Sequence, residues 1–111
     1  MSEEMRRYHR MGVALEMQVS GSDRRGAAFE EKTSSDDVSR GGCSFHTQHE
    51  LPTGTELELI IFRRSATRHP PTPFLTTGVV VRTANVDANH FKVSVRFTGP
   101  HFPTYASEST A

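Results

Sequence analysis

The feature that most constrains the fold of this sequence is the alternation of apolar and polar residues in several short runs. The clearest is HFKVSVRF, residues 90–97, where every second side chain is apolar. Because successive side chains of a β-strand point to opposite faces, this period predicts a strand with one buried face and one solvated face. The residues predicted by this period to face a core are Val13, Leu15, Met17, Val19, Leu57, Leu59, Ile61, Phe91, Val93, Val95 and Phe97.

Turn-forming residues separate these runs. GSDRRG (21–26), LPTG (51–54) and NVDAN (85–89) are rich in residues that tolerate tight backbone geometry. Three prolines within 63–73 predict an exposed loop, since proline cannot donate to a central ladder. We therefore expect an all-β fold, a barrel or sandwich whose sheet edges are hidden. The predicted strands are 12–20, 27–39, 43–48, 55–62, 74–84 and 90–97, with no convincing internal helix.

Length and composition bound the class of protein. The 111 residues suffice for one domain, and 13 basic residues balance 13 acidic ones, so general polyanion binding is not expected. The single cysteine, Cys43, excludes an intramolecular disulfide and fits a reducing compartment. No apolar run approaches the ~20 residues needed to span a bilayer. We expect a soluble cytoplasmic protein with a flexible N-terminal arm (1–10), a barrel (11–102) and a disordered tail (103–111).

A basic cluster, RRYHR, precedes the first predicted strand. Arg6 and Arg10 are four residues apart, so they share one side of the backbone in a helix and also in an extended segment. Arg7 points elsewhere. A guanidinium donates two parallel hydrogen bonds to phosphate oxygens or to the O6/N7 edge of guanine. The pair is a candidate clamp for such a group, although an isolated RxxxR is also typical of a solvated tail.

A second cluster is DDVSRGG, residues 36–42. In an extended strand Asp37 and Ser39 would share the outer face, while Val38 points into the core. An exposed carboxylate can accept hydrogen bonds from the N1–H and N2–H groups of guanine, and a serine hydroxyl can donate to a phosphate. Gly42 permits positive φ and lets a ligand or another segment approach the backbone closely. Taken alone, D-x-S-x-x-G also fits an ordinary turn.

Together the two motifs resemble the PilZ family of bacterial cyclic di-GMP receptors. The resemblance extends over roughly residues 5–99, because TGTELELIIF, GVVVR and VSVRF are similar to the middle, late and closing strands of that family. It implies a six-stranded antiparallel β-barrel. Members of the family often carry a C-terminal helix over the barrel. Here GPHFPTYASESTA has two prolines and no apolar stripe, so that helix is expected to be short or absent.

The resemblance also implies a ligand and its contacts. The N-terminal arginines would grip guanine edges and phosphates of cyclic di-GMP, and the second motif would hold the other side of the ligand on the barrel surface. The arm would become ordered on binding and change the surface shown to a protein partner. No further cofactor, membrane or nucleic-acid polymer is expected as a partner. The implied contacts are Arg6, Arg7, Arg10, Asp37, Ser39 and Gly42.

Catalytic and metal-binding patterns are weak. Cys43, His46 and His49 are spaced by three, which places neighbours on opposite faces of a strand and argues against a zinc site. Asp36 and Asp37 are adjacent, so we expect them to point apart rather than to act as a pair. No nucleophile elbow or phosphate-binding loop is visible. We therefore predict a binding module, not an enzyme.

Two alternatives remain open. The same fold could serve as an adaptor that binds only protein, although the complete motifs argue against it. A small nucleic-acid-binding barrel is the other alternative, and the neutral net charge and lack of aromatic residues suited to stacking argue against it.

Overall fold

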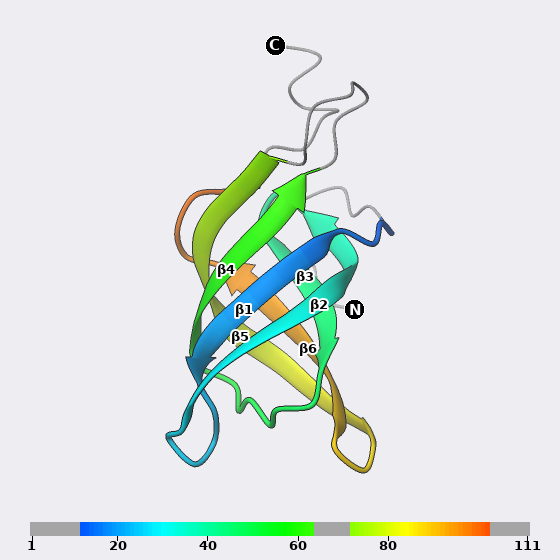
Figure 1. Ribbon diagram of the computed structural model, residues 1–111, viewed down its shortest axis with the longest axis vertical. Coiled ribbons are helices and arrows are strands. Elements are labelled where there is room, and N and C mark those ends of the chain that lie inside the picture. The colour runs from blue at the N-terminus through cyan, green and yellow to red at the C-terminus, as the bar shows by residue number, and fades with distance from the viewer. Residues whose placement is uncertain (1–11, 64–71, 103–111) are drawn as a thin grey trace.

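The computed structural model describes residues 12–63 and 72–102 of the chain, which form six antiparallel strands closed into a barrel (Figure 1). The six-stranded antiparallel barrel predicted from the sequence is confirmed. Within these described residues every element is a strand. The strands are β1 (Glu16–Ser22), β2 (Ala28–Ser39), β3 (Gly42–Thr47), β4 (Glu56–Arg63), β5 (Thr72–Asp87) and β6 (His90–Phe97).

The order of strands around the barrel is β1-β2-β3-β6-β5-β4, with β4 pairing back onto β1. This closure leaves no free sheet edge among the six strands, which removes the usual template for edge-to-edge aggregation. It also places β3 beside β6, where Cys43 pairs with Val95 and Phe45 with Val93. Residues far apart in the sequence thus share one stretch of barrel wall.

The barrel interior is filled by the apolar residues that the alternation assigned to it. Nine of the eleven are buried, and the other two, Val13 and Phe91, are half-buried and packed against the rest, which confirms the predicted inward face. Phe45 and Leu51 are fully buried, and Phe102 closes one end by packing edge-on against Phe74, with ring centroids 5.2 Å apart. The period of two had not placed Phe45, Leu51, Phe74 or Phe102 in the core.

Strand ends differ from the prediction chiefly in β5. Pro73, placed in the loop 63–73, instead pairs with Phe62 at the start of this strand, a position where proline is tolerated. The predicted turn 85–89 is also too long, because β5 continues to Asp87 and only two residues connect it to β6. Asn89 takes the positive φ of that turn (66°), a conformation that asparagine adopts more readily than most residues.

The proposed arm (1–10), the tail (103–111) and the question of a C-terminal helix lie outside the described residues. In the two stretches that the structure describes, no helix is long and apolar enough to cross a membrane.

Candidate functional site

The second motif lies at one end of the β2–β3 hairpin. Asp37 pairs with Ser44, and Ser39 pairs with Gly42, so the three motif residues come together around a two-residue turn. Because Val38 beside Asp37 is fully buried, Asp37 lies on the outer face of the barrel, where the sequence placed it.

The turn between the two strands is held by residues from the other end of the chain. The backbone N–H of Phe97 donates to the carbonyl of Gly41 at 2.8 Å, and that of Phe102 donates to the carbonyl of Arg40 at 3.0 Å. Backbone bonds from β6 and from the segment after it therefore attach the hairpin to the barrel. A site at this hairpin rests on rigid elements rather than on a free loop.

A β-bulge lies immediately before Asp37. The register of β2 on β3 shifts between Ser35 and Asp37, which leaves Asp36 as an extra residue. Ser35 and Val38 are 3% and 0% exposed. In a regular strand two residues three positions apart face opposite sides, so both face inward here only because the bulge changes the phase. Without it, Asp37 would point into the core.

The bulge also corrects the expectation that Asp36 and Asp37 point apart. Asp36 accepts a hydrogen bond from His46 Nε2 at 2.9 Å, and His46 faces outward because its neighbour Phe45 is in the core. Both carboxylates therefore lie on the outer face. The rule of alternation fails at this step because it assumes an unbroken ladder.

Ser39, expected on the outer face beside Asp37, is buried at the end of β2. The residue is only 5% exposed, and its Oγ donates to the carbonyl of Gly42 at 3.3 Å. Ser39 ends β2, so its side chain reaches across the tight turn to the paired strand. In this structure its hydroxyl supports the hairpin.

Gly42 likewise has a structural reason within the barrel. A Cβ at this position would lie 2.3 Å from the carbonyl oxygen of Val95. The close approach of β6 therefore requires glycine, and positive φ plays no part, because the described glycines with positive φ are Gly26 and Gly54. Another segment, rather than a ligand, occupies the space that this glycine leaves open.

Two arginines that the sequence reading gave no role share the outer face of this wall. In register, Arg96 pairs with Gly42, and Arg82 pairs with Ser94 beside Ser44. Both arginines are exposed. Their strings, GVVVR and VSVRF, carried the resemblance to the family, but only the pairing of β3, β6 and β5 shows that they flank the motif.

The same wall holds a polar atom without a partner. The hydroxyl of Ser44 is buried, points away from the core and has no hydrogen-bond partner among the residues described. Its neighbours across the sheet are Asp37 and Ser94. Buried hydroxyls are usually paired, but among the described residues those of Ser44 and Thr83 have no partner.

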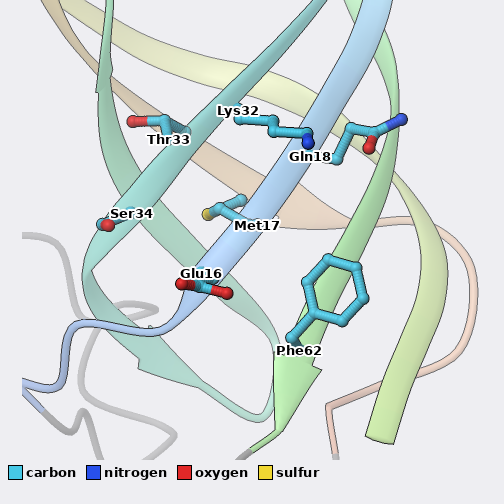
Figure 2. Close-up of a pocket in the computed structure, with 7 residues that line it drawn as sticks. All are labelled: Glu16, Met17, Gln18, Lys32, Thr33, Ser34 and Phe62. Carbon is cyan, nitrogen blue, oxygen red and sulfur yellow. The ribbon is translucent and has the colours of Figure 1, made fainter. Parts of the chain in front are cut away.

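A groove of about 510 Å³ lies on a different part of the wall (Figure 2). It is formed by β1, β2 and the end of β4 and contains none of the motif residues. Its lining mixes charged, polar and apolar side chains, namely Glu16, Met17, Gln18, Lys32, Thr33, Ser34 and Phe62.

The first motif cannot be placed against the second, because Arg6, Arg7 and Arg10 lie outside the described residues. Across residues 12–63 and 72–102, no group of three or more His, Cys, Asp or Glu side chains is arranged to hold a metal ion.

Comparison with known families identifies the class of protein. A model of the PilZ domain matches residues 4–105, which is nearly the whole chain. The chain therefore belongs to the PilZ domain family, as the sequence motifs indicated. No curated protein matches it.

Two solved structures share the fold. One is that of the Bacillus subtilis inhibitor of motility (MotI/DgrA), with a TM-score of 0.69 and 21% identity over 95% of this chain. This chain spans 46% of the length of that protein. The other is the PilZ domain with c-di-GMP of YcgR from Escherichia coli, with a TM-score of 0.56 and 16% identity, covering 84% of this chain and 77% of that one. At these identities the likeness establishes the fold alone.

Proposed function

We propose that this PilZ domain is a receptor for cyclic di-GMP. The observation that carries the proposal is the outward position of Asp37 on the β2–β3 hairpin, which the bulge at Asp36 produces in a chain that also holds the RxxxR motif. A carboxylate on this face accepts hydrogen bonds from a guanine edge. The c-di-GMP complex of the E. coli YcgR domain, which shares the fold, supports the same ligand class.

The charge of the surrounding face supports an anionic ligand. Arg82 and Arg96 flank the motif on β5 and β6, and guanidinium groups pair well with phosphate oxygens. In the proposal Arg6 and Arg10 supply the opposite side of the site, with Arg7 in support. Gly42 and Ser39 contribute by shaping the hairpin.

The proposed output is a change of surface. The arm of residues 1–10 closes over the ligand, and a protein partner reads the new surface. β5 offers apolar side chains that such a partner would cover, with Leu75 62% exposed.

Calorimetric titration of the purified protein with cyclic di-GMP tests the proposal. We expect stoichiometric binding that Arg10→Ala or Asp37→Ala weakens about 5- to 150-fold, since a good bidentate contact to a base is worth ~1–3 kcal/mol. Arg25→Ala and Glu58→Ala, on exposed positions of other parts of the barrel, are the matched controls and should bind as the wild type does.

The outcomes separate the alternatives. Failure of the folded wild-type protein to bind cyclic di-GMP ends the proposal and leaves the protein adaptor. Preference for an oligonucleotide, with affinity falling steeply as salt rises, favours the nucleic-acid-binding barrel instead. Amide signals of residues 2–11 that stay unchanged at saturating ligand end the proposed ordering of the arm.

A further inference from the structure

We infer that Asp36, His46 and His90 are positioning residues for the candidate site: they hold the bulge of β2 that turns Asp37 to the outer face. The inference rests on the proposed function, because the side chain that they position is the proposed contact to guanine. None of the three is among the ligand contacts that the motifs implied.

Asp36 is the extra residue of the bulge, and its carboxylate contacts the side chains of His46 and Lys92. Its Oδ2 accepts a hydrogen bond from His46 Nε2 at 2.9 Å and lies 3.3 Å from Lys92 Nζ. His46 and Lys92 are cross-strand partners on β3 and β6. A carboxylate on β2 is thus tied across two neighbouring strands, which restrains the bulged backbone from which it projects.

His46 is in turn held by His90. The distance between His46 Nδ1 and His90 Nε2 is 2.7 Å, and the two rings meet edge-on with centroids 4.8 Å apart. His90 begins β6, and its Nδ1 lies 3.9 Å from Asp87 Oδ1 at the end of β5. The chain of contacts therefore crosses four strands.

The chemistry of these groups orders the hydrogen atoms along the chain. An ionised carboxylate only accepts, so neutral His46 carries its hydrogen on Nε2, toward Asp36. Its Nδ1 must then accept, and the donor is Nε2–H of His90. A proton added to His90 at Nδ1 would face Asp87 and keep every bond. The arrangement is directional: it fixes the ring of His46 in the tautomer that holds Asp36.

The contacts among Asp36, His46 and His90 lie beside the motif, which is why they affect ligand binding. Asp37 follows Asp36 directly, so rotation of the bulge changes the direction of the Asp37 carboxylate. Catalytic and binding groups are commonly aimed by bulges of this kind. These contacts lie on a solvated surface, where the net stabilisation from each ion pair is small. Their loss should therefore affect ligand affinity more than global stability.

The test compares Asp36→Ala and Asp36→Asn with a matched histidine control. His49→Gln is that control, because His49 lies two residues after the end of β3 and stacks on Phe29 instead of contacting Asp36. With 1 mM EDTA present to remove stray metal ions, we expect Asp36→Ala to weaken cyclic di-GMP binding at least tenfold and Asp36→Asn to weaken it less. His49→Gln should stay within twofold of the wild type.

A second readout needs no ligand. Long-range proton–nitrogen spectra at pH 8 should show both His46 and His90 as the Nε2–H tautomer, and Asp36→Ala should shift the ring signals of His46 by removing the acceptor of its Nε2–H. A residue that merely stabilised the fold would lower the melting temperature without this change. If Asp36→Ala does not fold, Asp36→Asn and His46→Gln carry the same comparison.

The results distinguish failure of the inference from failure of the proposed function. If the wild type binds cyclic di-GMP and the Asp36 variants bind within twofold of it, the inference is wrong and the function stands. If the folded wild type does not bind, the function fails, and the positioning role fails with it. The Nδ1–H tautomer at His46 in the wild type also overturns the inference.

Discussion

The two sides of the barrel wall are built differently. On one side, β1, β4 and the first half of β5 pair in unbroken register, as from Met17 with Ile61 to Gly21 with Leu57. On the other side, β2 and the second half of β5 are bulged where they pair with β3 and β6. We refer to these as the regular wall and the bulged wall.

The outer faces of the two walls also differ in the side chains that they carry. The regular wall carries exposed or half-exposed apolar residues, including Ile60 and its partner Leu75. The bulged wall carries the carboxylates, histidines and arginines of the candidate site, and its exposed apolar residues, Val81 and Val86, are the extra residues of the two bulges in β5. An unbroken ladder keeps every second residue inward, whereas a bulge adds one residue and redirects those after it. The candidate site therefore depends on irregularities of the ladder that the regular wall lacks.

The largest expected effect is at the two residues whose direction the bulge sets. Val38 is fully buried, and Asp37 before it lies on the outer face. Val38→Asp would bury an unpaired carboxylate, so it should cost about 3 kcal/mol or more of the free energy of unfolding, measured by urea denaturation. Asp37→Val, on the outer face, is the control and should lose much less. Equal losses in the two variants would show that the bulge does not set the phase of β2.

The next largest loss of stability is expected from glycine substitutions on the two walls. Gly42→Ala on the bulged wall forces a Cβ to 2.3 Å from the Val95 carbonyl oxygen. On the regular wall, a Cβ at Gly21 would lie 2.9 Å from the flexible Leu57 side chain and 3.0 Å from the Glu56 carbonyl oxygen, which is a milder overlap. We expect losses of about 3 and about 1 kcal/mol, in line with overpacking elsewhere. Gly12→Ala, with nothing within 4 Å, should be neutral in the same thermal unfolding series. Equal losses at Gly42 and Gly21 would contradict the prediction.

A smaller effect is expected where the regular wall is linked to the segment after β6. Thr76 Oγ1 donates to the Pro100 carbonyl at 2.6 Å, close to the segment that bonds the hairpin turn at Arg40. Thr76→Val should lose about 1 kcal/mol of stability in denaturant unfolding, the typical net value of one hydrogen bond. Thr77→Val provides the comparison, because that exposed hydroxyl shares a hydrogen bond with the hydroxyl of Thr98 at 3.0 Å. Equal losses of stability in the two variants would contradict a stabilising hydrogen bond between Thr76 and Pro100.

The smallest effect is expected on the outer face of the regular wall. Leu75→Ser removes an apolar side chain that is 62% exposed, so stability should change by less than about 0.5 kcal/mol. Thermal unfolding with Leu59→Ala as the buried counterpart checks this, since core truncations of leucine cost about 2–5 kcal/mol. A loss above about 1 kcal/mol at Leu75 would mean that its side chain packs against other residues of the same molecule.

Alternation predicted the regular wall well. The inward residues of β1, β4 and β6 and the bounds of β6 all follow from the period of two. The hairpin that carries the second motif was also predictable from Gly41 and Gly42. The bulged wall was less predictable, because a bulge depends on which residues of the partner strand are paired, and no local pattern near Asp36 reports that. The burial of Ser39 and the reason for Gly42 were missed for the same cause.

By itself the sequence determined six short strands with apolar inner faces and the two motifs that define the family, because the period of side chains and the turn residues are local properties. Tertiary structure alone decided which way Asp37 points and what surrounds it. His46 and His90 lie 44 residues apart in the chain and 2.7 Å apart at their ring nitrogens. Contacts of that kind arise only from strand order and register, which are set by the packing of the whole barrel.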